Sequence, residues 1–364
     1  MGEPSMNQAP SVPPLLLASS PHIASPVNSR QLMANMLIAL TPVSAWGVII
    51  FGLPALLNII VSVAAASLGE ALFRAIARQE VRMADLSAGV TGLLLALIIP
   101  PSTPFWMTAL GAVFAVVAAK EFFGGLGANV FNPALIGRAF LLMSFPAAMT
   151  KWHFPQGYFV TKFTNAMGNP ALVDGVSGVT PMNILKAGSS AAGIGKVFEA
   201  AKLSVSNDYW STIKTLFIGN HAGSIGESSI LLILAALIFL LVTKTIDWRA
   251  PAGMIAAGVL ASWVLGMDPL VGILGGGIMF GAIFMATDYV TSPLTAKGKL
   301  IFGFGAGLIT MLIRKWGTYP EGVSYGILIM NAVVPFLNKL LPRKYGFVPK
   351  KKPGAAHAGR GEAK

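Results

Sequence analysis

About ten mostly apolar segments follow one another along this chain, and most are long enough to cross a lipid bilayer. A transmembrane helix needs about 20 such residues. The sequence is 54% hydrophobic and only 11% charged, whereas a soluble domain carries about 25% charged residues. We therefore expect an all-α polytopic membrane protein. The predicted spans are residues 33–51, 53–72, 86–100, 104–120, 133–150, 228–245, 250–266, 269–287, 299–314 and 323–341.

The basic residues predict how these spans are oriented. Lys and Arg are absent from the short connections near residues 52, 102 and 267, and they gather in the connections on the other side. Cytoplasmic connections carry an excess of basic residues, so we expect cytoplasmic N- and C-termini. Arg314 and Lys315 are the exception, because they fall on the predicted outer side. The basic residues on the predicted inner side are Arg30, Arg74, Arg78, Arg82, Lys120, Lys244, Arg249, Lys297, Lys299 and those of the C-terminal tail.

The same pattern divides the chain into five regions. We expect a disordered cytoplasmic tail at 1–30, a first transmembrane block at 31–150, an extracytoplasmic loop at 151–227, a second transmembrane block at 228–341 and a basic cytoplasmic tail at 342–364. Net charge is +12, and eight of the 26 Lys and Arg lie between Lys339 and Lys364. A basic stretch next to an apolar segment favours contact with anionic lipid of the bilayer. A nucleic-acid partner is not expected.

Each transmembrane block contains a polar break beside an apolar helix. "GGLGANVFNPAL" (124–135) lies near the end of the first block, and "FMATDYVTSPLT" (284–295) lies about 160 residues later in the second. Five spans per block is an odd number, so the two blocks would have opposite orientations. This favours two inverted five-helix repeats with broken helices, an architecture typical of transporters. Coincidental similarity of the two breaks is the alternative.

The two breaks hold the polar residues of greatest interest inside the transmembrane blocks. Asn129 and Asn132 lie in the first break, and Asp288 and Thr291 lie in the second. An acid beside lipid is costly and points to a functional site, so these residues could line an ion path. The alternative is a structural role in closing the breaks. Glu70 and Arg138 are expected to pair with each other or with other subunits.

The loop segment "DGVSGVTPM" (174–182) allows two interpretations. As structure, it is an exposed turn in which Thr180 caps a short helix that begins at Pro181. As a functional site, it offers a threonine hydroxyl, flanked by small residues, to a modifying enzyme. The chain has no cysteine, and its four histidines lie outside the apolar segments. An iron–sulfur cluster held by its own thiolates and a haem between its helices are therefore excluded.

Several long motifs resemble those of one family of membrane proteins. They are "SPH" (20–22), "DLSAGVTGLLLALIIPPSTPFW" (85–106), "KEFFGGLGANVFNPAL" (120–135), "DGVSGVTP" (174–181), "GSIGESS" (223–229), "ATDYVTSPLTAKGK" (286–299) and "IRKWGTYPEGVSYGILIMNAVVPFLNK" (313–339). Together they are similar to the RnfD/NqrB family, whose members belong to ion-translocating oxidoreductases. The RnfD branch, which serves the Rnf ferredoxin:NAD⁺ oxidoreductase complex, resembles the chain more than the NqrB branch, which serves the Na⁺-translocating NADH:quinone oxidoreductase.

The resemblance implies a function and a set of residues. Thr180 would carry FMN through a phosphoester, and Asp174, Gly175, Ser177 and Gly178 would form the segment that a flavin transferase recognises. Val179 departs from the family's usual alanine. A second, noncovalent flavin (riboflavin) is also implied, without a residue-by-residue match to the family. Its candidate site, as the alternative to an ion path, is the set of polar residues in the two breaks, Asn129, Asn132, Asp288 and Thr291. Electrons would pass through the FMN while the complex moves Na⁺ or H⁺ across a bacterial inner membrane.

The resemblance further implies partners, which are the other Rnf subunits (A, B, C, E and G). The ferredoxin and NAD sites would lie on these partners, since this chain has no soluble domain for them. Two alternatives remain open from sequence alone. One is an NqrB-type component of the quinone reductase, and the other is a flavin-free secondary transporter built from inverted repeats.

Overall fold

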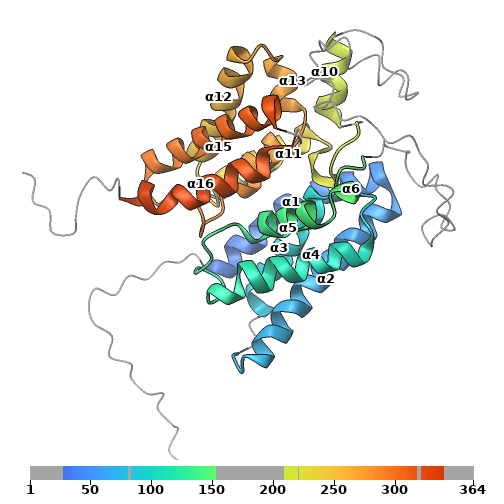
Figure 1. The fold of residues 1–364 in the computed structure, drawn as a ribbon, viewed down its shortest axis with the longest axis vertical. Coiled ribbons are helices and arrows are strands. Elements are labelled where there is room, and N and C mark those ends of the chain that lie inside the picture. Colours follow the sequence, from blue (N-terminus) through green and yellow to red (C-terminus); the bar gives the residue numbers. More distant parts are fainter. Residues whose placement is uncertain (1–27, 81–82, 153–208, 220, 318–320, 340–364) are drawn as a thin grey trace, which may run out of the picture.

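The computed structural model describes residues 28–80, 83–152, 209–219, 221–317 and 321–339. Within these ranges the chain is helical and contains no strand, which confirms the predicted all-α fold. Among the described residues, four helices are long and apolar enough to cross a membrane, and shorter apolar helices accompany them. The chain is a polytopic membrane protein. In Figure 1 the blue-to-green helices form one group and the orange-to-red helices form another.

The first group contains five principal helices. They are α1 (Ser29–Phe51), α2 (Leu53–Ile76), α3 (Ser87–Ile98), α4 (Phe105–Ala119) and α5 (Pro133–Ser144). Short 3₁₀ turns, η1 (Met83–Asp85) and η2 (Glu121–Phe123), precede α3 and follow α4, and α6 (Pro146–Met149) follows α5. Helix α3 ends where Pro100 and Pro101 follow, as expected of residues that cannot continue a helix.

The second group contains five matching elements. They are α11 (Ile230–Val242), α12 (Arg249–Val264), an interrupted third element, α15 (Ala296–Trp316) and α16 (Val323–Asn338). The third element consists of α13 (Pro269–Leu274), α14 (Ile278–Phe280) and the π-helical turn η5 (Gly281–Met285). Helix α10 (Tyr209–Ile218) and the 3₁₀ turn η4 (Ile225–Glu227) precede this group.

Packing within the groups shows which helices correspond. In the first group α2 packs against α4, and α4 against α5; in the second group α12 packs against α15, and α15 against α16. One matched pair runs in opposite directions, since Asn35 near the start of α1 donates to Thr245, just beyond the end of α11, at 3.0 Å. These contacts agree with the predicted inverted repeats, and the two groups are called the first and second repeat below.

This matching of helices shows that the two breaks do not occupy equivalent positions in the two repeats. The break at 124–132 precedes the fifth helix of the first repeat, so its counterpart is the connection between α15 and α16. The break at 286–295 precedes the fourth helix of the second repeat, so its counterpart is the connection at 99–104. The two breaks that look alike in sequence are thus not equivalent positions. The interruption at Gly275–Gly277 was also not predicted, since it falls inside an expected continuous span.

The last part of the predicted loop 151–227 is buried between the repeats. Ile225 donates its backbone N–H to the carbonyl of Ile99 at 3.4 Å, and His221, Ser224 and Glu227 are buried. A Cβ on Gly226 would lie 2.7 Å from Leu97 Cβ, so only glycine allows this approach. Residues 221–229 therefore form part of the core, although their composition is that of a surface loop.

Candidate functional site

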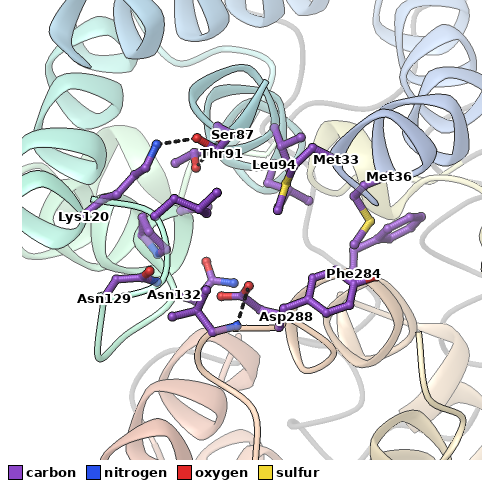
Figure 2. A pocket seen from close by; sticks show the side chains of 16 residues that line it. Met33, Met36, Ser87, Thr91, Leu94, Lys120, Asn129, Asn132, Phe284 and Asp288 are labelled. Carbon is purple, nitrogen blue, oxygen red and sulfur yellow. Dashed lines mark hydrogen bonds between the residues drawn. The ribbon is translucent and has the colours of Figure 1, made fainter. Parts of the chain in front are cut away.

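A pocket opens where the two repeats meet, and it gathers both predicted breaks. It has about 590 Å³ of empty space, a figure that includes the open solvent at its mouth. Figure 2 shows side chains from α1 and α3 on one side and from the two breaks on the other. One part of the lining is apolar, with Met33, Met36, Val90, Leu94, Leu126 and Phe284. The other part is polar, with Ser87, Thr91, Lys120, Asn129, Asn132 and Asp288.

Asp288 occupies the polar side of the pocket, just beyond the end of η5. Thr291 donates its hydroxyl to Asp288 Oδ2 at 2.9 Å, and the backbone N–H of Val290 approaches Oδ1 at 3.5 Å. Burial raises the pKa of the Asp288 carboxyl, and these hydrogen bonds oppose the rise. Burial and the nearby Asp288 raise the pKa of Tyr289 to about 12. Tyr289 therefore keeps its proton near neutral pH and donates it to the carbonyl of Thr245.

Asn129 and Asn132 line the same side of the pocket as Asp288 (Figure 2). Asn132 is the N-cap of α5, and its Oδ1 accepts the N–H of Leu135 at 3.3 Å. Asn129 donates Nδ2 to the carbonyl of Phe131 at 3.2 Å. The predicted set of Asn129, Asn132 and Asp288 is thus brought together, with Thr291 directly behind Asp288.

A side chain that the sequence did not single out joins the two breaks. With its amide in the orientation that satisfies both neighbours, Asn331 of α16 donates to the Thr291 carbonyl at 3.2 Å. In the same orientation it accepts the backbone N–H of Asn132 at 3.1 Å. Asn331 sits in a mostly apolar predicted span, and this polar exception was the available signal.

A buried cluster of charges adjoins the pocket through Lys120. Lys120 Nζ donates to Glu70 Oε2 and to Ser87 Oγ, both at 2.6 Å. Arg74 approaches Glu121 at 3.1 Å and Glu70 at 3.5 Å. The cluster has two acids and two bases, so its net charge is zero, as buried charges require. Lys120 lines the pocket, whereas the sequence indicated only a basic residue of the inner side.

Glu70 and Arg138 do not pair with each other, contrary to one expectation. Glu70 binds Lys120 within the first repeat. Arg138 of α5 pairs with Glu321 and lies 3.3 Å from the Ser324 hydroxyl of α16. Both residues therefore find partners inside this chain, and Arg138 joins the two repeats.

The described side chains of the buried segment 221–229 do not form a recognisable ligand site. His221 Nδ1 lies 3.1 Å from the Ala222 carbonyl, while His221 Nε2 and Ser224 Oγ have no hydrogen-bond partner among the described residues. The described parts of the chain contain no group of three or more His, Cys, Asp or Glu side chains that could hold a metal ion. Ser228 donates its hydroxyl to the Ile225 carbonyl at 2.8 Å.

The predicted attachment site lies outside the described residues. Thr180 and its flanking residues Asp174, Gly175, Ser177 and Gly178 all fall in the range 153–208, so the prediction made for them is unchanged.

Comparison with known proteins gives matches over nearly the whole chain. Residues 16–346 match the NQR2, RnfD, RnfE family. The chain is 39% identical over 338 residues to the D subunit of the proton-translocating ferredoxin:NAD(+) oxidoreductase complex of Clostridium ljungdahlii, with 91% of this chain and 96% of that protein covered. It is 37% identical over 343 residues to the D subunit of the Na(+)-translocating ferredoxin:NAD(+) oxidoreductase complex of Acetobacterium woodii, with 94% and 98% covered. It is also 37% identical over 345 residues to the D subunit of an ion-translocating oxidoreductase complex of Stutzerimonas stutzeri, with 89% and 94% covered.

Proposed function

The chain belongs to the NQR2, RnfD, RnfE family, and from this premise we propose that it is the D subunit of an Rnf-type ion-translocating ferredoxin:NAD⁺ oxidoreductase. The observation that carries the proposal is its similarity, over nearly their full length, to relatives that bear this name. These two relatives are named for different ions, H⁺ and Na⁺, and are nearly equally similar to this chain. The comparison therefore supports the reaction class and leaves the ion open.

The arrangement of the described ends supports an orientation in a bacterial inner membrane. Contacts place the start of α1 beside Thr245, and Lys299 beside Asp247 at 3.2 Å, so these residues lie at one end of the helix bundle. This end carries most of the basic residues of the connections, and we assign it to the cytoplasm. The N- and C-termini are then cytoplasmic, and 151–208 is extracytoplasmic. The proposed partners are the other Rnf subunits (A, B, C, E and G), which supply the ferredoxin and NAD sites.

Thr180 is the residue to which we assign covalent FMN. The supporting observations are the segment "DGVSGVTP" and the absence of cysteine, which leaves a flavin as the electron carrier that this sequence can hold. A bound flavin supplies the redox chemistry, and the protein supplies its position and electrostatic surroundings.

Thr180→Val is expected to abolish flavin attachment, because valine keeps the shape of threonine and lacks the hydroxyl that forms the ester. The full chain is expressed with its flavin transferase and run on a denaturing gel under ultraviolet light. The wild-type band is expected to fluoresce, and so is the Thr164→Val control, which removes another threonine hydroxyl from the same loop. A dark wild-type band in the presence of active transferase refutes the FMN assignment.

The pocket between the repeats is the place we propose for a second, noncovalent flavin. A riboflavin ring system is planar, with apolar faces and a polar edge of donors and acceptors. The pocket offers apolar walls from Met33, Leu94 and Phe284 and a polar side from Asn129, Asn132 and Asp288. Lys120 uses two of its three N–H donors on Glu70 and Ser87 and can offer the third to a ligand. The alternative is an ion path that uses Asp288 and Thr291.

Leu94→Trp is expected to weaken riboflavin binding by about tenfold or more, which corresponds to about 1.4 kcal/mol or more, because the larger ring fills space in the pocket. The measurement is quenching of riboflavin fluorescence by the purified full chain, expressed without flavin transferase. Leu68→Trp is the matched control, since Leu68 on α2 is 67% exposed and lies outside the pocket. Equal affinities for the two variants contradict this location of the flavin.

A further inference from the structure

A row of hydrogen-bonded side chains connects the pocket with a second hollow in the first repeat. This second hollow is wide and open, with about 1490 Å³ of empty space counted out to solvent. Asp85, Arg74 and Glu80 give it a charged lining. Leu126 lines both hollows and separates them at this point. We call this second hollow the vestibule.

The row runs from Lys120 through Ser87 to Asp85. Lys120 Nζ donates to Ser87 Oγ at 2.6 Å, and Ser87 Oγ donates to Asp85 Oδ1 at 2.8 Å. Lys120 and Ser87 both line the pocket, and Asp85 lines the vestibule. Lys120 and Ser87 are buried, and Asp85 is half-buried. Both distances lie within the range of strong hydrogen bonds. Figure 2 shows the Lys120–Ser87 contact at the edge of the pocket.

We propose that Lys120, Ser87 and Asp85 form a proton route between the pocket and the vestibule. In the direction set by the hydrogen bonds, Nζ gives a proton to Ser87 Oγ while Ser87 gives its own proton to the Asp85 carboxylate. Lys120 is left as a neutral amine, which takes the next proton from a ligand in the pocket. Asp85 then releases its proton to solvent in the vestibule. One proton leaves the ligand and one reaches solvent, and the three side chains return to their starting states.

The surrounding charges hold the first residue of this route in place. Glu70 binds Lys120 Nζ from α2, and Glu121 Oε1 lies 4.0 Å from it. Arg74 binds both of these acids. From the second repeat, Asp288 and Tyr289 face the same pocket. Ser87 is fixed from two directions, since its backbone N–H also donates to Asp85 Oδ1, at 2.9 Å.

The proposal deepens the proposed function, because it rests on the assignment of a flavin to the pocket. Flavin reduction and oxidation exchange protons as well as electrons. A ring that fills the pocket excludes solvent from it, so protons need another way in and out. The Lys120–Ser87–Asp85 row begins at the pocket wall and ends in an open hollow, which meets this need.

A first experiment tests the route with oxidised riboflavin bound in the pocket, so that Lys120 cannot exchange directly with solvent there. Hydrogen–deuterium exchange of the Lys120 ammonium is followed by NMR of the full chain labelled with ¹⁵N-lysine, with Lys120→Arg used to assign the signal. Ser87→Ala is expected to slow this exchange by about tenfold or more, since a positioned relay group contributes about 10² or more to proton transfer. Ser87→Thr keeps a hydroxyl and is expected to exchange at nearly the wild-type rate. Equal exchange in wild type and Ser87→Ala overturns the proposal.

A second experiment follows the protons directly. Full chain loaded with reduced riboflavin is mixed with ferricyanide, which accepts electrons only, in weak buffer containing a pH dye. In wild type, proton release is expected to keep pace with flavin oxidation. In Asp85→Asn it is expected to lag by about tenfold or more. Glu80→Gln is the matched control, because it removes one carboxylate from the same vestibule without interrupting the row.

The two experiments separate failure of the route from failure of the flavin assignment. If riboflavin does not bind the wild-type chain, the flavin assignment to the pocket fails, and the route that rests on it fails with it. If riboflavin binds and Asp85→Asn releases protons as fast as Glu80→Gln, the route is refuted while the flavin site stands.

Discussion

Glu70→Met is expected to destabilise the folded protein by about 3–5 kcal/mol, because it leaves an uncompensated charge in the interior. Lys120 Nζ lies 2.6 Å from Glu70, and each side chain is only 2% exposed. Without Glu70 the cluster keeps two cations, Lys120 and Arg74, and a single acid, Glu121. The loss is measured by SDS titration of the purified chain in mixed micelles, followed by circular dichroism.

A double-mutant cycle distinguishes this charge effect from a simple loss of packing. Lys120→Met is expected to cost a similar amount, since it leaves two acids and one cation. The double variant Glu70→Met/Lys120→Met keeps the Arg74–Glu121 pair, whose atoms approach to 3.1 Å, and the cluster is again neutral. Its cost is expected to be smaller than the sum of the two single costs by more than 1 kcal/mol or so. Additive costs would contradict an electrostatic origin.

The sequence singled out residues that share one pocket, but it did not predict the contacts around them. Asn129, Asn132 and Asp288 were singled out because polar residues at the ends of apolar helices are costly unless they have a use. The structure places them in one pocket. The partners of Glu70 and Arg138 could not be predicted, because pairing depends on which helices are neighbours. Lys120, Ser87 and Asn331 were missed for the same reason.

The fold predicted from sequence was wrong where the composition of a segment does not reveal its place in the structure. Residues 221–229 are rich in Gly and Ser, which is typical of a surface loop, yet His221 and Glu227 are buried between the repeats. The interruption of the third element at Gly275–Gly277 could not be predicted either, since glycine is common inside transmembrane helices. Arg314 explains how the interruption is tolerated: its guanidinium donates to the carbonyls of Gly272 and Gly275, which have lost helical partners.

Gly303→Val is expected to prevent correct packing of the second repeat. Helices α12 and α15 approach so closely that a Cβ at position 303 would lie 2.1 Å from the carbonyl oxygen of Ala250. The same contact includes Gly253, whose Cβ would meet the Leu300 carbonyl at 2.6 Å, and Gly307, whose Cβ would meet the Met254 carbonyl at 2.4 Å. Glycines spaced four residues apart allow membrane helices to pack this closely. Because the opposing atoms belong to the backbone, no side-chain rotation relieves the clash.

The expected result for Gly303→Val is aggregated protein or a broad, early elution in gel filtration, and the smaller change Gly303→Ala gives a graded measurement. Overpacking by one methyl group is expected to cost about 1–3 kcal/mol in the SDS titration. Gly258→Ala on α12 is the control, since the nearest atom to its added Cβ would be 3.7 Å away, an ordinary contact distance. It is expected to be neutral or slightly stabilising, because alanine favours a helix more than glycine does. Equal stability of Gly303→Ala and Gly258→Ala would mean that α12 and α15 are not packed through their backbones.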